Sequence, residues 1–277
     1  MFQATSSSAG KSTLTAGLCR LLARKGVSVA PFKAQNLSLN SFVTVDGGEI
    51  GISQAHQAWA CGTEPHVDMN PVLLKPKGRS GMQVIVNGRP YKEIGPDGEK
   101  VETDELIKAV KEAYSRLISR YDVIVIEGSG SPAEVNLRGR DIANMTTARI
   151  TSAPVILVGD IDKGGVFAGL FGTYSLLSED EKRMVKGFII NRFRGDASIL
   201  KKGVDELERR LSCPCLGIMP YLRLNVPAED SMELGKSGPM SSEGDVRDSW
   251  SRSLDLLADE MARSLDIGKI ENLIAKG

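Results

Sequence analysis

The chain has 277 residues, enough for one large α/β domain or for one domain with a small appendage. Lys and Arg together number 35, as do Asp and Glu, so no net charge directs the chain toward nucleic acid or an anionic membrane. No apolar run is long enough to span a bilayer, and the first residues lack the basic start and apolar core of a signal peptide. We therefore expect a cytoplasmic protein that binds neither nucleic acid nor membrane.

Helices are predicted wherever apolar residues recur every three or four positions. The first covers residues 11–25, in which leucines recur at this spacing. A second is predicted from a cap at Thr103, with an apolar stripe that reaches Leu117, and a third covers residues 197–211.

Short apolar, β-branched runs alternate with these helices and predict strands. They lie at residues 28–32, 121–127, 155–160, 187–191 and 215–219. Because their apolar residues are continuous rather than alternating, both faces of each strand should be buried, which is typical of a parallel sheet covered by helices. The alternation predicts a doubly wound α/β fold of the P-loop NTPase type, with a mainly parallel sheet and helices on both faces.

Two segments depart from this alternation. Residues 78–100 hold five glycines around an apolar run, which predicts a strand with turns, arranged as an edge hairpin. Near residue 233 the composition changes to Gly, Ser, Pro and charge, which is typical of a linker. The predicted division is a synthetase-type domain over 1–232, a linker over 233–249 and a helical tail over 250–277.

The residues before the first helix form a candidate phosphate loop, from Thr5 to Thr13. Backbone N–H groups of such a loop, together with the helix N-terminus, surround phosphate oxygens. Lys11 would reach the β- and γ-phosphates, and the Ser12 hydroxyl would bind Mg²⁺. The nucleotide contacts that the loop predicts are Ser8, Gly10, Lys11, Ser12 and Thr13.

This loop departs from the usual motif, because Thr5 occupies the position of its first glycine. In a variant used by ATP-dependent carboxylate-activating enzymes, that glycine falls one residue earlier, where this chain has Ala4. Both forms keep Gly-Lys-Ser, a tripeptide that also arises by chance in a serine-rich loop.

Polar side chains at the ends of predicted strands are further candidates, because ligands of open α/β sheets bind beyond the carboxyl ends of strands. Glu127 precedes a glycine-rich turn and could hold Mg²⁺; the alternative is a solvated carboxylate. Asp160 opens a loop with a second acid, a lysine and two glycines. Asn191 could recognise adenine through its amide, although a turn residue is the more common use of such an asparagine.

Longer polar strings in this chain resemble the cobyric acid synthase family, within the dethiobiotin-synthetase-like group of P-loop enzymes. The resemblance extends over nearly all of residues 3–231. The matching strings lie at residues 30–36, 46–51, 69–76, 127–137, 141–145, 160–168 and 191–196.

The resemblance implies a reaction: amidation of several peripheral carboxylates of a corrin, starting from adenosylcobyrinic acid a,c-diamide. ATP would phosphorylate a carboxylate, and ammonia would displace phosphate from the acyl phosphate, with ATP and Mg²⁺ as the cofactors.

The resemblance also implies roles for particular residues. Lys11, Lys33 and Glu127 would be catalytic, and Asn191 would join the nucleotide contacts. Ser12, Glu49 and Glu127 would surround Mg²⁺. The corrin carboxylates and amides would be lined by Gln35, Asn36, Asn70, Lys75, Asn136 and Asp141. Turn and cap duty is the alternative for about a third of these last residues.

The family ordinarily continues into a class I glutaminase domain, with a nucleophilic cysteine on an elbow and a His-x-Glu pair. Neither motif is present here, since neither His56 nor His66 is followed by a glutamate two positions later. Ammonia is therefore expected from solution or from a separate glutaminase subunit. A homodimer is left open.

Two alternatives of other classes remain. One is a nucleotide-switch ATPase like ParA or MinD, which would share the sheet and the loop. Because a switch needs no corrin pocket, it would leave the Gln35-Asn36 and Asn144-Met145 strings unexplained. The other is a non-catalytic, truncated relative, for which the altered loop and the absent glutaminase motifs speak.

Overall fold

The computed structural model describes residues 1–78, 81–95, 102–137, 139–224 and 243–276. Its main sheet is parallel, in the order β2-β9-β1-β10-β11-β12, with β9 and β1 joined through a bridge between Glu127 and Phe2. The strands are β1 (Phe2–Ala4), β2 (Val29–Phe32), β9 (Val123–Ile126), β10 (Val155–Asp160), β11 (Val185–Phe193) and β12 (Cys215–Pro220). The predicted strands and the parallel sheet are confirmed.

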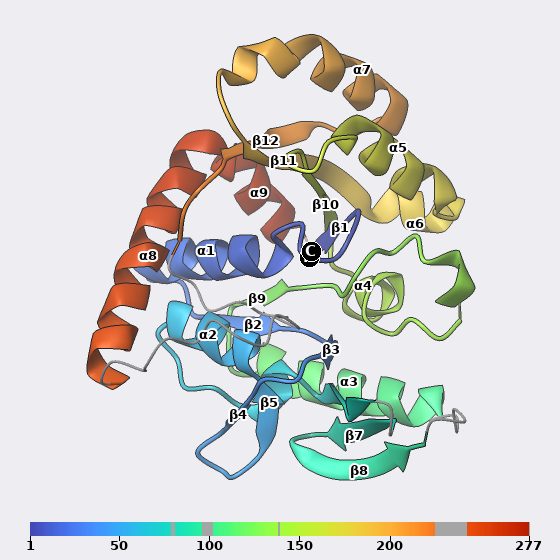
Figure 1. The fold of residues 1–277 in the computed structure, drawn as a ribbon, viewed down its shortest axis with the longest axis vertical. Helices are drawn as coiled ribbons and strands as arrows, with labels where there is room; N and C mark the ends of the chain where they lie inside the picture. Colours follow the sequence, from blue (N-terminus) through green and yellow to red (C-terminus); the bar gives the residue numbers. More distant parts are fainter. Residues whose placement is uncertain (79–80, 96–101, 138, 225–242, 277) are drawn as a thin grey trace.

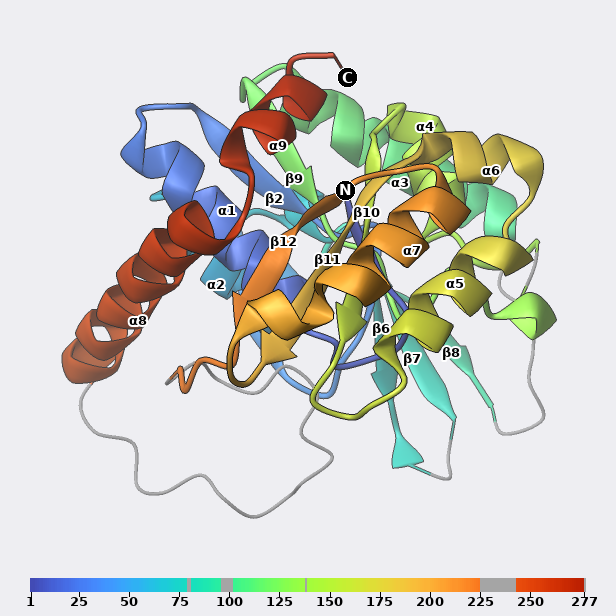
Figure 2. The ribbon, with the colours of Figure 1, turned by 90° about the horizontal axis from the view of Figure 1, so that it is seen from above.

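Helices cover both faces of this sheet, as Figures 1 and 2 show. They are α1 (Lys11–Arg24), α2 (Ile52–Ala60), α3 (Thr103–Ile118), α4 (Met145–Thr151), α5 (Val166–Leu176), α6 (Glu179–Met184), α7 (Lys201–Leu211), α8 (Glu243–Ser264) and α9 (Ile267–Ile274). Alternate residues of a strand point to opposite faces. Thus Ile156 and Val158 pack in the core with α1 and α8, whereas Val155 and Leu157 pack with α4, α5 and α7. The prediction of a doubly wound α/β fold is confirmed.

A second, mixed sheet extends the molecule beyond β2. Its order is β3-β6-β7-β8, with β3 and β6 parallel and the other pairs antiparallel. These strands are β3 (Gln35–Leu37), β6 (Val72–Pro76), β7 (Met82–Val86) and β8 (Arg89–Ile94), and a separate hairpin joins β4 (Ser41–Val43) to β5 (Glu49–Gly51). The predicted edge hairpin is confirmed as β7–β8. Its two-residue turn has positive φ at Asn87 and Gly88, as a type I′ turn requires.

Two sequence-based boundaries of helices need correction. Thr103 is the first residue of α3 rather than its cap, which is Glu102. The helix predicted over 197–211 begins with a 3-10 turn, Ala197–Leu200, before α7. Two further 3-10 turns lie at Val67–Met69 and Val135–Leu137.

The predicted linker also ends too late. Residues 233–242 lie outside the described part of the chain, whereas residues 243–249 belong to α8. Composition misled here, because Gly and Ser at a helix start have the same signature as a linker.

Helix α8 runs beside α1 (Figure 1). Gly17 of α1 faces Met261 and Leu257 so closely that a Cβ at Gly17 would lie 2.3 Å from Met261 Sδ. Arg20 Nε donates to Asp255 Oδ1 at 2.8 Å across the same contact. The helical tail therefore forms part of the core around α1.

Candidate functional site

The predicted phosphate loop connects β1 to α1 at the carboxyl end of the main sheet. Two residues in it have left-handed backbone, Ser8 with φ of 57° and Gly10 with φ of 97°. The backbone of the loop is held by the neighbouring strand β11, because Asn191 Nδ2 near the end of that strand donates to the Ala9 carbonyl at 2.9 Å. A Cβ on Gly10 would lie 2.1 Å from that same Nδ2, so glycine is required here both for φ and for space.

Lys11, the first residue of α1, crosses the loop to a second segment. Its Nζ donates to the Ser6 carbonyl at 3.2 Å and to the Gly130 carbonyl at 2.8 Å. The ammonium thus lies between the phosphate loop and the glycine-rich turn that follows β9. This is a position from which a cation can reach phosphates held by the loop.

Glu127 is the centre of the site. It follows β9, is fully buried, and accepts hydrogen bonds on both carboxylate oxygens. Oε1 accepts from Ser12 Oγ at 2.7 Å and from Lys33 Nζ at 2.8 Å, and Oε2 accepts from Gln57 Nε2 at 2.6 Å. The structure therefore brings together three of the predicted residues, Ser12, Lys33 and Glu127, at the start of the phosphate-loop helix.

The charge state of Glu127 follows from this environment. Burial alone would raise the pKa of the carboxyl, but the Lys33 ammonium and the hydrogen bonds from Lys33, Gln57 and Ser12 outweigh it, so the pKa lies below its usual value. An ionised carboxylate and a hydroxyl, 2.7 Å apart beside a phosphate loop, are hard oxygen donors of the kind that Mg²⁺ binds.

No group of three or more His, Cys, Asp or Glu that could hold a metal is found within the described residues. Mg²⁺ needs no such group, since one or two protein oxygens, phosphates and water complete its shell. The residues at Ser12 and Glu127 therefore fit this ion.

Glu49, the third predicted metal ligand, lies on β5 and has different partners. Its carboxylate pairs with Lys75 of β6 and accepts a hydrogen bond from Ser41. Partial burial works against ionisation, but these two donors prevail and lower the pKa of Glu49. The structure thus joins Glu49 to Lys75, a predicted corrin contact, and its role as a metal ligand stays a prediction.

Two predicted corrin contacts are buried amides that hold neighbouring segments. Asn70 accepts from the Gly51 N–H at 2.9 Å and donates to the Lys33 and Val72 carbonyls. Asn36 on β3 donates to Gln54 Oε1 of α2 at 2.8 Å.

The other predicted contacts are distributed more widely. Asp141 accepts from the backbone N–H groups of Ala143 and Asn144, which is the turn duty weighed above. Gln35 is half-buried on β3, and Asn136 is exposed in its 3-10 turn. The corrin role of these residues and the adenine role of Asn191 stay predictions.

Sequence reasoning missed two side chains at the site. Gln57 contacts Glu127, and Asn144 brackets Ser129 by accepting from its N–H at 3.1 Å and donating to its carbonyl at 2.6 Å. The sequence did hold a signal for Gln57. It lies three residues after Gln54, so the two amides share one face of a helix, and each is followed in the sequence by an alanine.

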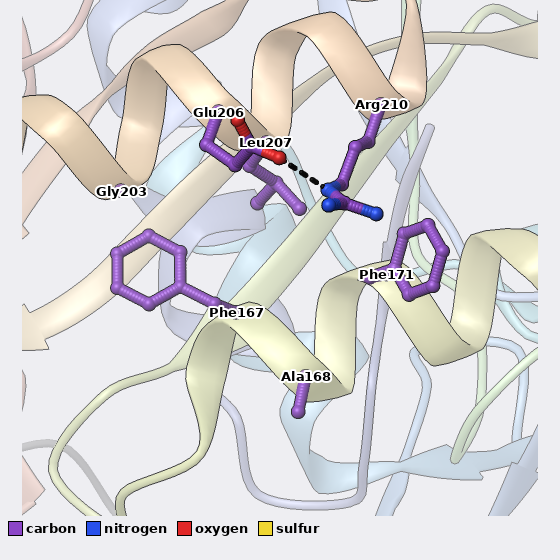
Figure 3. A pocket seen from close by; sticks show the side chains of 7 residues that line it. All are labelled: Phe167, Ala168, Phe171, Gly203, Glu206, Leu207 and Arg210. Carbon is purple, nitrogen blue, oxygen red and sulfur yellow. Dashed lines mark hydrogen bonds and ion pairs between the residues drawn. The ribbon is translucent and has the colours of Figure 1, made fainter.

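A hollow between α5 and α7 lies apart from these residues (Figure 3). Phe167 and Phe171 of α5 flank it, and Arg210 of α7 lies over the Phe171 ring at 5.5 Å while pairing with Glu206. None of the predicted site residues lines this hollow.

The fold and the site together define a nucleotide-binding domain. The chain belongs to the family described as CobQ/CobB/MinD/ParA nucleotide binding domain, which it matches over residues 1–232. Among its similar relatives are the probable cobyric acid synthase of Methanosarcina barkeri, 54% identical over 230 residues, and the cobyric acid synthase of Shewanella oneidensis, 56% identical over 238 residues. These matches confirm the predicted resemblance.

The alignments cover 83% and 84% of this chain and 47% of each relative, so the chain spans about half the length of the relatives it matches. A similar solved structure is the MinD cell division protein of Aquifex aeolicus, 15% identical with a TM-score of 0.46, covering 95% of this chain and 94% of that one. Within the described residues, none of the helices has both the length and the apolar character to cross a membrane.

Proposed function

We propose that this chain is an ATP-dependent carboxylate–amine ligase that amidates peripheral carboxylates of a corrin, converting adenosylcobyrinic acid a,c-diamide to cobyric acid. The observation that carries the proposal is the buried Glu127, which joins Ser12 of the phosphate loop to Lys33. The relatives named cobyric acid synthase supply the substrate class.

The chemistry suits these residues. A carboxylate oxygen of the corrin attacks the γ-phosphorus of ATP, the bond from γ-phosphorus to the bridging oxygen breaks, and ADP leaves. Ammonia then attacks the acyl carbon, inorganic phosphate leaves and one proton is released. Because the carboxylate is a poor electrophile until it is phosphorylated, the protein contributes mainly orientation and charge neutralisation.

Each residue has a definite task in this scheme. The Lys11 ammonium offsets charge on the β- and γ-phosphates, and Lys33 offsets charge on the γ-phosphate and the incoming carboxylate. Ser12 and Glu127 would hold Mg²⁺, which when bound neutralises phosphate charge. The ionised state of Glu127 suits that task.

The test is an acyl phosphate assay with ATP, Mg²⁺ and the corrin diamide, in which hydroxylamine replaces ammonia. Wild-type protein should form a corrin hydroxamate and release ADP only when the corrin is present, and Lys11→Ala should do neither. ATP hydrolysis that ignores the corrin would favour a nucleotide switch of the ParA or MinD type. Absence of ATP binding would favour a non-catalytic relative.

The nitrogen donor is proposed to be free ammonia or ammonia from a separate glutaminase. Burial raises the pKa of Cys19 well above its usual value, that of Cys213 to about 12 and that of Cys215 to about 11, so these thiols stay protonated and are poor nucleophiles. We expect amidation with ammonium salts, increasing with pH as free ammonia increases. Release of glutamate from glutamine by the purified chain would contradict this proposal.

A further inference from the structure

Gln57 is a buried amide that none of the tasks above requires. It lies in the middle of α2 with 1% of its surface exposed, and it points at the site rather than along its own helix. Its Nε2 donates to Glu127 Oε2 at 2.6 Å and lies 3.4 Å from the Ser12 carbonyl. One amide group therefore touches both residues that would hold Mg²⁺.

Because Gln57 donates to only one oxygen of the Glu127 carboxylate, the two oxygens have different partners. Oε2 is bound by Gln57, whereas Oε1 is directed to the Ser12 hydroxyl and the Lys33 ammonium. Without the Gln57 donor, the carboxylate could rotate about its last torsion, a bond with broad rotational preference. A carboxylate held on one oxygen presents the other in a constant direction.

Packing alone does not explain a glutamine at this position. Its Oε1 is buried without a hydrogen-bond partner in the described structure, and an unsatisfied buried acceptor destabilises the folded state. An apolar side chain of similar length would avoid that cost. The presence of an amide here therefore indicates a task for its N–H group.

The position of Gln57 is fixed by contacts between helix α2 and two of the predicted corrin-binding residues. The helix follows β5 directly, its first turn is held by the bond from Gly51 N–H to Asn70, and Gln54 accepts from Asn36 one turn before Gln57. The face of α2 that holds Glu127 is thus fixed by Asn36 and Asn70, two of the predicted corrin contacts.

We propose that Gln57 is a positioning residue for Glu127, fixing Oε2 so that Oε1 faces Ser12 and the Mg²⁺ of the bound nucleotide. This rests on the proposed function only in requiring that the loop binds a magnesium nucleotide. In this proposal Gln57 acts through the Glu127 carboxylate, to which its Nε2 donates.

The test is the affinity for a fluorescent ATP analogue, measured without turnover in EDTA and in saturating Mg²⁺. Gln57→Met, which keeps the length of the side chain and removes the donor, should leave affinity in EDTA within twofold. It should reduce the gain that Mg²⁺ confers by about tenfold, the loss usual when the partner of a metal ligand is removed. Should Gln57→Met fail to fold, Gln57→Asn serves instead, because it keeps the amide but withdraws it by one methylene.

Two comparisons separate positioning from a general packing defect. Thr15→Val is the matched control, since it removes a buried hydroxyl without a hydrogen-bond partner one turn beyond Ser12, and it should keep the full Mg²⁺ gain. In a double-mutant cycle with Glu127→Gln, adding Gln57→Met should change the Mg²⁺ gain by less than twofold.

Other outcomes overturn the inference. Additive effects in the cycle, or an unchanged Mg²⁺ gain in Gln57→Met, would show that Gln57 does not act through Glu127, while leaving the proposed function intact. A wild-type chain that binds no magnesium nucleotide would remove both proposals together.

Discussion

The ion pair between Lys33 and Glu127 permits a sharp test of the site as a buried electrostatic unit. Lys33 Nζ lies 2.8 Å from Glu127 Oε1, and the two side chains are 5% and 1% exposed. At an effective dielectric of about 20, the attraction at this distance is about 6 kcal/mol. Lys33→Met removes it, but it also removes the cost of burying the ammonium, and Glu127 keeps its bonds to Ser12 and Gln57. We expect a net loss of about 3–4 kcal/mol of unfolding free energy.

Urea unfolding at pH 7.5, followed by far-UV circular dichroism, measures this loss. The matched control is Lys75→Met, which breaks a pair with Glu49 that is about a quarter exposed on both sides and should cost less than about 1 kcal/mol. Adding Glu127→Gln to Lys33→Met removes the uncompensated charge and should restore about 2 kcal/mol. Equal losses for Lys33→Met and Lys75→Met, or no recovery in the double variant, would refute the reasoning.

Two other predictions concern backbone and pH. Gly10→Ala should weaken nucleotide binding at least tenfold, because the added Cβ would displace Asn191 from the loop. The control Gly26→Ala also lies at positive φ but has open space around it, so it should lower stability without weakening nucleotide binding. Equal nucleotide affinity of the two variants would contradict this reasoning. Burial lowers the pKa of His56, which packs against Trp250, from 6.5 to about 4, so the unfolded chain binds more protons between these values and stability falls as pH drops through this range. Between pH 7 and 4.5, the unfolding free energy of the wild-type protein should therefore fall by about 2 kcal/mol more than that of His56→Gln, as measured by urea unfolding. Equal losses in the two proteins would show that folding does not lower the pKa of His56.

The fold could be predicted because its signals are local. Continuous apolar runs such as residues 155–160 identify buried parallel strands, and the glycine-rich turn after Glu127 identifies a strand end. The second sheet was harder to predict from the sequence, since β3 has three residues and pairs with β6, a strand far along the chain. Pairing between distant segments leaves no periodic trace in either one.

The same distinction applies to the site. Ser12, Lys33 and Glu127 were predicted from a motif and a resemblance, and the structure brings them within hydrogen-bonding distance. The contact of Gln57 with Glu127 could not be predicted, because it depends on how α2 lies against α1. Nor does a strand-end position reveal that Asn191 holds the loop backbone at Ala9.

The packing of α8 on the phosphate-loop helix has a consequence for how this architecture accommodates additional domains. The Leu265 backbone pairs with Gly217 of β12, so the chain on both sides of residues 225–242 is anchored in one core. The entropic cost of closing a loop grows only with the logarithm of its length. A whole folded domain could therefore be inserted between β12 and α8 at small cost to the stability of the rest. Helix α8 would then hold the C-terminal end of the inserted domain close to the core around α1.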